Sequence, residues 1–159
     1  MIEVRNVYKS FNGKEVLKDI SFTFEAGKTN LIIGQSGSGK TVLMKSVIGI
    51  HQVDKGQILY NGRDFTKMSN KETALLRQEI GMLFQGSALF DSMTVEENVR
   101  FPLEMFSNKT RKEWEKRVAF CLDRVGLSHA AKLFPSEISG GMQKRAAIAR
   151  AIVLEPTYL

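Results

Sequence analysis

The sequence predicts a mixed α/β fold in which an antiparallel β region comes first, a glycine-rich loop between a strand and a helix follows, and helices dominate the second half. Three observations support this prediction. Apolar runs in the first 65 residues are joined by Asn-Gly turn signals. Residues 34–41 read GQSGSGKT and directly follow a short apolar run. Ser or Thr precedes Glu by three residues at three places after residue 68, which is the capping-box pattern of a helix start.

The N-terminal region is predicted to form antiparallel strands. Residues 2–7 and 16–25 read as strands, and the second places alternate aromatic and aliphatic residues on one face. Asn12 and Gly13 between them are a strong hairpin signal, because both residues tolerate positive φ. Residues 56–60 read as one more strand, which a second Asn-Gly pair ends.

The glycine-rich loop fits the pattern G-x-x-x-x-G-K-[ST] at every fixed position. Residues 29–33 before it are predicted to form a strand, and residues 42–48 after it a helix that ends at Gly49. Glycines let backbone N–H groups converge on an anion, and the helix adds its positive end. Lys40 can reach the β- and γ-phosphates, and Thr41 offers a hydroxyl to Mg²⁺. The structural alternative is a glycine-rich turn with a solvated lysine.

The second half is predicted to be mainly helical. One helix starts at Ser69 and runs to about residue 79, and residues 80–84 then read as a buried strand. Thr94 and Thr110 start two more helices. The second of these has one apolar face and stops at Gly126; the face consists of Trp114, Val118, Cys121, Leu122 and Val125. A last helix is predicted over about residues 140–154.

Length and composition narrow the classes of protein. The 159 residues suffice for one domain with a core, and 43% hydrophobic with 25% charged residues indicates a globular protein. The net charge of +6 suits nucleic acid, anionic lipid or a nucleotide alike. Cys121 is the single cysteine, so no internal disulfide forms. The N-terminus lacks the apolar core of a signal peptide, and no apolar run approaches the ~20 residues that span a bilayer. We expect a soluble, cytoplasmic protein.

A second anion-binding pattern lies about 100 residues after the loop. Residues 138–143 read ISGGMQ, in which a serine and two glycines begin the last helix. With both motifs in this order, the whole chain resembles the nucleotide-binding subunit of ABC transporters. The resemblance implies a P-loop NTPase fold with an N-terminal antiparallel β subdomain, a RecA-like core and an α-helical signature subdomain. It places the β and P-loop core at about 1–85, the helical subdomain at about 86–140 and the return to the core at about 141–159.

The resemblance also implies roles for individual residues. The Walker A loop and the residue after it hold the phosphates; these residues are Gly34, Gln35, Ser36, Gly37, Ser38, Gly39, Lys40, Thr41 and Val42. Phe11 takes the place of an aromatic that stacks on adenine, with Tyr8 as the alternative. Gln85 matches the glutamine that helps to hold Mg²⁺ and the attacking water, so Lys40 and Gln85 are the catalytic candidates and Thr41 and Gln85 the metal candidates.

The implied assembly is a head-to-tail homodimer on a membrane permease. Ser139, Gly140 and Gly141 match the signature motif, which binds the γ-phosphate of ATP held by the other subunit. The subunit is then expected on the inner face of the cell membrane, with a permease contact near Gln85. Apolar residues that we expect to be exposed for this contact lie between 86 and 106; they are Leu89, Phe90, Met93, Phe101 and Met105.

Two departures from the family pattern bear on function. Ile138 and Met142 stand where leucine and glutamine are usual, and with residues 84–95 they resemble the subgroup that moves phospholipids. The chain also lacks the acidic pair and the later histidine of the pattern, which position water for hydrolysis. We therefore expect the 159 residues to be the N-terminal part of a longer subunit, inactive alone. With a bare parallel sheet edge, we also expect them to be poorly stable and prone to aggregate.

Other functions remain open at this point. A non-catalytic nucleotide-binding module would also lack the acidic pair. A DNA-handling ATPase of the same superfamily is compatible with the charge of +6, but the basic residues are spread along the chain, so we expect no nucleic acid partner. A small-molecule kinase would not need residues 139–141.

Overall fold

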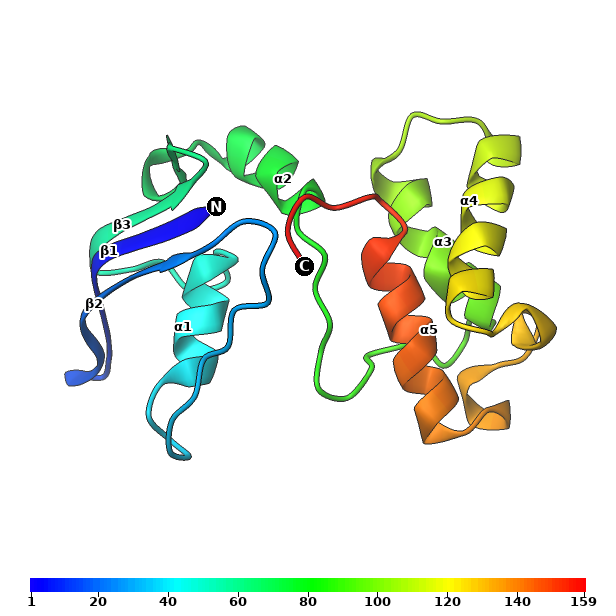
Figure 1. Ribbon diagram of the computed structural model, residues 1–159, viewed down its shortest axis with the longest axis horizontal. Helices are drawn as coiled ribbons and strands as arrows, with labels where there is room; N and C mark the ends of the chain where they lie inside the picture. Colours follow the sequence, from blue (N-terminus) through cyan, green and yellow to red (C-terminus); the bar gives the residue numbers. More distant parts are fainter. The chain divides into compact units, whose positions relative to one another are not determined.

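The chain forms two compact units in a computed structural model that describes all of residues 1–159 (Figure 1). The first unit is Met1–Leu75 and the second is Leu76–Leu159. An antiparallel sheet occupies the first unit, and the second is built mainly from helices. The predicted α/β class, with an N-terminal antiparallel β region, is therefore confirmed. No helix has the length and apolar character needed to cross a membrane.

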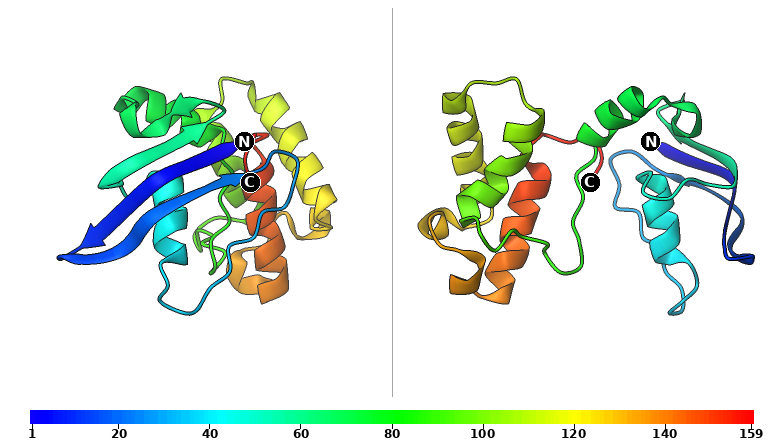
Figure 2. Two further views of the ribbon diagram at one scale, coloured as in Figure 1. Left: turned by 60° about the vertical axis from the view of Figure 1, so that its left-hand side comes forward. Right: turned by 180° about the vertical axis from the view of Figure 1, so that it is seen from behind.

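The first unit contains a four-stranded antiparallel sheet in the order β2-β1-β3-β4 (Figure 2). The strands are β1 (Ile2–Phe11), β2 (Lys14–Phe24), β3 (Lys55–Tyr60) and β4 (Arg63–Asp64). Asn12 and Gly13 have φ of 48° and 76° and make the predicted hairpin turn. The strands reach closer to this turn than the apolar alternation predicted, because main-chain pairing continues through Phe11 and Lys14.

Helix α1 (Lys40–Val47) belongs to the same unit and packs against the sheet through its apolar side. The core buries residues from helix and strands alike; they include Val4, Val7, Leu17, Leu43, Val47, Ile58 and Tyr60. The Tyr60 hydroxyl donates a buried hydrogen bond of 2.7 Å to the carbonyl of Val47. This bond attaches the last turn of α1 to the end of β3.

The predicted strand at residues 29–33 is absent. This segment has no strand assignment, and Leu31 and Ile33 are each 82% exposed. A strand persists only as a member of a hydrogen-bonded ladder, and no other segment of the chain pairs with these residues. An apolar run indicates β propensity but does not supply a partner.

The second unit has a helical core. The 3₁₀ turn η1 (Phe65–Lys67) and α2 (Asn70–Gln78) lead into it, and the principal helices are α3 (Val95–Phe106), α4 (Arg111–Arg124) and α5 (Gly140–Ile152). Short 3₁₀ turns, η2 (Ser128–Ala130) and η3 (Pro135–Glu137), connect α4 to α5. The predicted apolar face of α4 packs in this core with residues of α3 and α5, among them Val99, Leu103, Ala146 and Ala149.

The predicted buried strand at residues 80–84 is reduced to a single parallel bridge. Ile80 pairs with Tyr158, the Gly81 N–H donates to the Tyr158 carbonyl at 2.7 Å, and the Tyr158 N–H donates to Glu79 at 3.0 Å. A Cβ at Gly81 would lie 2.5 Å from the Ala151 carbonyl oxygen, so the chains approach closely here. Beyond this contact Leu83 and Phe84 are nearly half exposed, and the ladder does not continue.

Candidate functional site

The glycine-rich loop lies immediately before α1 and depends on backbone shapes that other residues rarely adopt. Gly37 and Gly39 have φ of 79° and 95°. A Cβ at Gly39 would lie 3.2 Å from the Val16 and Leu17 side chains, so the loop is packed against β2 at this point. Gly39 is the N-cap of α1, and no side chain caps this helix start. The loop therefore presents main chain, not side chains, at the positive end of the helix.

Lys40 folds back over the loop. Its ammonium donates to the carbonyls of Gly34 and Gln35, both at 2.7 Å. The Ser38 N–H donates to the Gln35 carbonyl at 3.2 Å, which tightens the same turn. Because an ammonium has three donors, one N–H of Lys40 is left for another acceptor.

The start of α1 has the donors that a phosphate needs. The N–H groups of Lys40, Thr41 and Val42 have no acceptor in the protein, as expected for a helix start without a cap. No acidic residue lies in the first turn to compete for them. The Thr41 side chain is exposed beside them, as are Ser36 and Ser38. This donor set fits a nucleotide triphosphate, and the Thr41 hydroxyl fits a ligand of Mg²⁺.

Phe11 ends β1 in the same unit and keeps 39% of its surface exposed. Its ring meets His51 edge-on at 5.2 Å between centroids, and the Lys9 ammonium lies 5.3 Å from the ring centroid. Asp54 holds Lys9 at 2.7 Å and accepts the Ser10 N–H at 2.6 Å. The hydrogen bond from Lys9, followed by that from the Ser10 main chain, lowers the pKa of Asp54. Tyr8, the alternative aromatic, is only partly exposed.

Gln85 lies in the second unit, in an irregular segment between α2 and α3, and its side chain is exposed. Two residues further on, Ser87 and Ala88 have φ of 61° and 48°. A left-handed backbone conformation costs a non-glycine residue about 1–3 kcal/mol, so neighbouring groups must hold Ser87 and Ala88 in it. Two nitrogens of the Arg150 guanidinium donate to the carbonyls of Ser87 and Ala88, at 2.8 and 2.7 Å.

Asn98 holds the other end of this segment. Its side chain is fully buried, accepts the Phe90 N–H at 2.7 Å and donates to the carbonyls of Phe90, Met93 and Thr94 at 3.0 Å. Neither Asn98 nor Arg150 is predicted from sequence to have a role in the site. A polar residue at a buried helical position was the available signal for Asn98, whereas Arg150 reads from sequence as one more basic residue of its helix.

Ser139 caps α5, and its hydroxyl accepts the Met142 N–H at 3.2 Å. A Cβ at Gly140 would meet nothing within 4 Å, and one at Gly141 would meet only the Ser139 hydroxyl at 3.9 Å. Neither glycine has a positive φ. The fold of one chain therefore gives no reason for two glycines here. The Met142 side chain packs against the helical core, which accounts for an apolar residue at that position.

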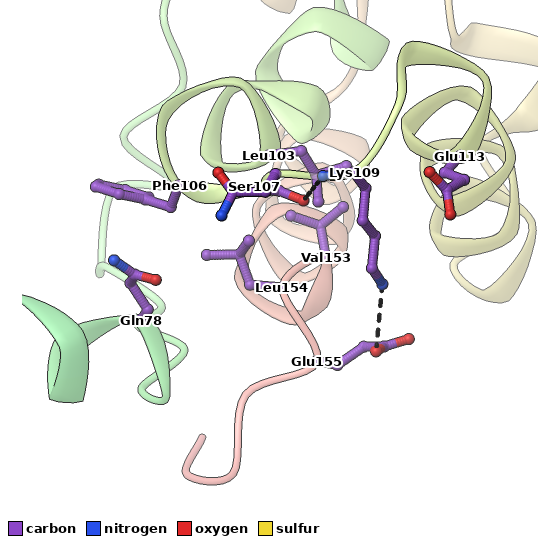
Figure 3. Close-up of a pocket in the computed structure, with 10 residues that line it drawn as sticks. Gln78, Leu103, Phe106, Ser107, Lys109, Glu113, Val153, Leu154 and Glu155 are labelled. Atoms are coloured by element: carbon purple, nitrogen blue, oxygen red, sulfur yellow. Dashed lines mark hydrogen bonds and ion pairs between the residues drawn. The ribbon is translucent and has the colours of Figure 1, made fainter.

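A cavity lies elsewhere in the second unit (Figure 3). Its volume is about 520 Å³, and it opens between the end of α3 and the end of α5. Lys109 and Glu155 face each other across it at 4.0 Å. None of the residues predicted for the nucleotide site lines it.

The predicted site residues are thus divided between the units. The first unit brings together residues 34–42 at the start of α1 and carries Phe11 on its sheet. The second unit carries Gln85 and residues 139–141.

Comparisons with known proteins agree on one family. A family profile described as "ABC transporter" matches residues 17–159. The probable ribonucleotide transport ATP-binding protein mkl of Mycobacterium leprae (strain TN) is 43% identical over 158 residues, which are 99% of this chain and 46% of that protein. The chain therefore spans about half the length of this curated relative. The cell division ATP-binding protein FtsE of Escherichia coli (strain K12) is 38% identical over 160 residues, which cover 100% of this chain and 72% of FtsE.

The fold also matches solved structures of ATP-binding cassettes. A dimeric structure of the ATP-binding cassette MJ0796, in a post-hydrolysis state bound to ADP and Pi, matches with a TM-score of 0.86 at 29% sequence identity. The match covers 98% of this chain and 71% of that one.

Proposed function

Since the chain belongs to the ABC transporter family, we propose that it is the ATP-binding subunit of a transporter and that residues 34–42 hold ATP with Mg²⁺. The donor set at the start of α1 carries this proposal: unpaired N–H groups of Lys40, Thr41 and Val42 beside a lysine with one remaining donor. Mg²⁺ would neutralise charge on the phosphates, with Thr41 and Gln85 as its protein ligands. Phe11 would stack on adenine through its exposed face.

Residues 139–141 would bind the γ-phosphate of ATP held by a second copy of the chain, in a head-to-tail homodimer. The open space over Gly140 and Gly141 supports this role, because a phosphate can reach the main chain there. Lys40 would stabilise charge on the phosphates, and Gln85 would orient water. We propose that the 159 residues alone bind ATP without hydrolysing it, since none of their carboxylates has the position of the acidic pair that orients water in the family.

The test uses both the 159-residue chain and the full-length subunit with its permease. The chain alone is expected to bind Mg²⁺-ATP in calorimetry and to release no phosphate. The full-length complex is expected to release phosphate and to dimerise when ATP is added. Calorimetry that detects no nucleotide binding to either form contradicts the proposal.

A permease contact near Gln85 is part of the proposed function. Of the apolar residues expected to be exposed between 86 and 106, Phe90 and Met105 are 43% and 58% exposed, whereas Leu89, Met93 and Phe101 are only partly exposed. Phe90 also packs on Phe101, with ring centroids 4.9 Å apart. Phe90→Glu is therefore expected to weaken assembly with the permease, and unchanged assembly would assign Phe90 to the packing of its own unit. The subunit would be cytoplasmic and peripheral at the inner face of the membrane.

We propose phospholipid as the transported substrate. The support is the sequence resemblance of residues 84–95 and of Ile138 and Met142 to the lipid-moving subgroup. The names of the two relatives point to ribonucleotide transport and to cell division, so both are alternatives for this chain. Lipid that co-purifies with the permease complex would support the proposal. Reconstituted uptake of a ribonucleotide, without lipid transfer, would replace it.

A further inference from the structure

Arg150 holds main chain that lies far from it in the sequence. Its guanidinium donates through separate nitrogens to two consecutive carbonyls, those of Ser87 and Ala88, and takes part in no ion pair that the structure contains. The side chain is half-buried, and burial lowers the pKa of the guanidinium. These carbonyls lie 63 and 62 residues away along the chain, in the segment that begins with Gln85.

The contact matters because the segment holds its shape only in part by itself, through bonds from the Ser87 N–H to the Phe84 carbonyl at 3.2 Å and from the Ala88 N–H to the Gly86 carbonyl at 2.6 Å. Ser87 and Ala88 both have left-handed backbone conformations, and such residues persist only where surrounding groups fix them. Ser87 is 6% exposed, so removal of Arg150 takes a charged hydrogen-bond donor from a carbonyl of a buried residue. Asn98 fixes the far end at Phe90, which leaves Arg150 as the only side chain that fixes the end next to Gln85.

We propose that Arg150 is a positioning residue that sets the location of Gln85 for ATP hydrolysis and links it to α5, the helix that begins at residues 139–141. This inference rests on the proposed function, because it assigns a purpose to Gln85. The link is direct: one end of α5 carries the serine and glycines, and Arg150, ten residues after Gly140, holds the segment of Gln85. A shift of α5 along its axis therefore moves both groups together.

Arg145 provides a matched control on the same helix. Its guanidinium also donates to two main-chain carbonyls, Val125 at 2.8 Å and Gly126 at 3.4 Å, but these end α4 and lie far along the chain from Gln85. Loss of either arginine removes two hydrogen bonds to main-chain carbonyls, so a general effect of losing such bonds appears in both variants, although Arg145 is the more exposed of the two. An effect confined to Arg150 reports on the segment of Gln85.

The experiment compares Arg150→Met, Arg150→Lys and Arg145→Met in the full-length subunit with its permease. The measurements are kcat and KM for Mg²⁺-ATP, the melting temperature, and hydrogen exchange of the amides of residues 84–90. Arg150→Met is expected to lower kcat about tenfold, to change KM less than about twofold and to speed exchange in this segment. Arg150→Lys should recover part of the loss, because an ammonium can still donate to one carbonyl. Arg145→Met should leave kcat within about twofold.

Several outcomes overturn the inference. Unchanged exchange at residues 84–90 in both Arg150 variants overturns it, as does an equal fall of kcat in Arg145→Met. If Arg150→Met does not fold, Arg150→Lys decides the question in the same way, with a smaller effect in the same direction. If the wild-type complex hydrolyses ATP and both Arg150 variants have the same kcat as the wild type, only the inference about Arg150 is refuted. A wild-type complex that binds no ATP refutes the proposed function itself.

Discussion

The helices of this protein begin in two different ways. Helices α3 and α4 start with complete capping boxes, in which Glu97 and Glu113 return to the main chain of Thr94 and Thr110. Helices α1 and α5 start with glycine inside or beside the first turn and have no acidic residue there. A carboxylate in the first turn neutralises the positive end of a helix, whereas its absence leaves that end available to an anion.

This difference separates helix starts that serve the fold from those that we assign to ATP. Any other residue at position 39 would have a strained backbone and would displace Val16 or Leu17. Gly39 is therefore needed by the fold as well as by the site that we assign to ATP. Neither the backbone conformation nor the packing at Gly140 and Gly141 requires glycine. Glycine lowers the stability of a helix by roughly 0.5–1 kcal/mol relative to alanine, so their presence in α5 needs another cause.

The largest effect is expected at Lys40. Lys40→Ala should weaken Mg²⁺-ATP binding by about 10- to 100-fold, because a hydrogen bond to a charged group contributes about 1.5–3 kcal/mol. Calorimetric titration measures the change. Lys45→Ala on the same helix is the control, since the exposed Lys45 side chain makes no hydrogen bond or ion pair. Equal ATP affinities for the two variants would contradict the assignment of the nucleotide site to the start of α1.

Gly39→Ala tests the glycine start of α1. The substitution places a Cβ 3.2 Å from β2 at a φ of 95°, which should destabilise the first unit by about 1–3 kcal/mol. Thermal unfolding measures this loss. Ala at Gly37 is a useful comparison, because its φ of 79° is also strained but its Cβ meets nothing within 4 Å. A smaller loss at Gly37 would isolate the contribution of packing against β2.

Gly141→Ala should have the opposite sign for stability. With ordinary backbone and open space, alanine is expected to stabilise α5 by about 0.5–1 kcal/mol. In the full-length subunit the same methyl group should nevertheless reduce ATP-dependent dimerisation, measured by analytical ultracentrifugation. If the variant is stabilised but dimerises as the wild type does, the assignment of residues 139–141 to the nucleotide site is wrong.

The smallest effect concerns pH and the capped helices. Hydrogen bonds from the Thr94 main chain and then its hydroxyl lower the pKa of Glu97 from its ordinary value of 4.5, and bonds from Thr110 do the same for Glu113. A lowered folded-state pKa gives stability that is complete above pH 4.5 and is lost as the pH falls through the folded value. Unfolding curves between pH 7 and 3 should show this loss. Glu97→Gln should make the free energy of unfolding depend less steeply on pH in this range. An unchanged dependence would argue against the capping carboxylate as the source of the loss.

Sequence predicted the features that depend on neighbouring residues. The hairpin at Asn12 and Gly13 and the helix starts at Thr94 and Thr110 are present as expected, because turns and caps are formed by residues at most a few positions apart. The glycine loop before α1 is likewise local, and its conformation follows from its glycines and Lys40.

Features that depend on distant partners were not predicted. Residues 29–33 and 80–84 have the composition of strands, but a ladder needs a partner that composition does not identify. The contacts of Arg150 join residues 62 and 63 positions apart, and no periodicity in the sequence marks them. The roles of Phe11, Gln85 and residues 139–141 came from family resemblance and stay predictions until nucleotide binding is measured.

The posture of Lys40 has a consequence for selectivity. Its ammonium already donates to two carbonyls of its own loop, so these carbonyls compete with any small anion in solution for the cation. Chloride or bicarbonate can gain little more than one hydrogen bond from it, whereas a polyphosphate also engages several main-chain donors at once. If the loop holds ATP as we propose, it would select ligands by the number of oxygen atoms that they offer, and simple anions would compete poorly with nucleotides.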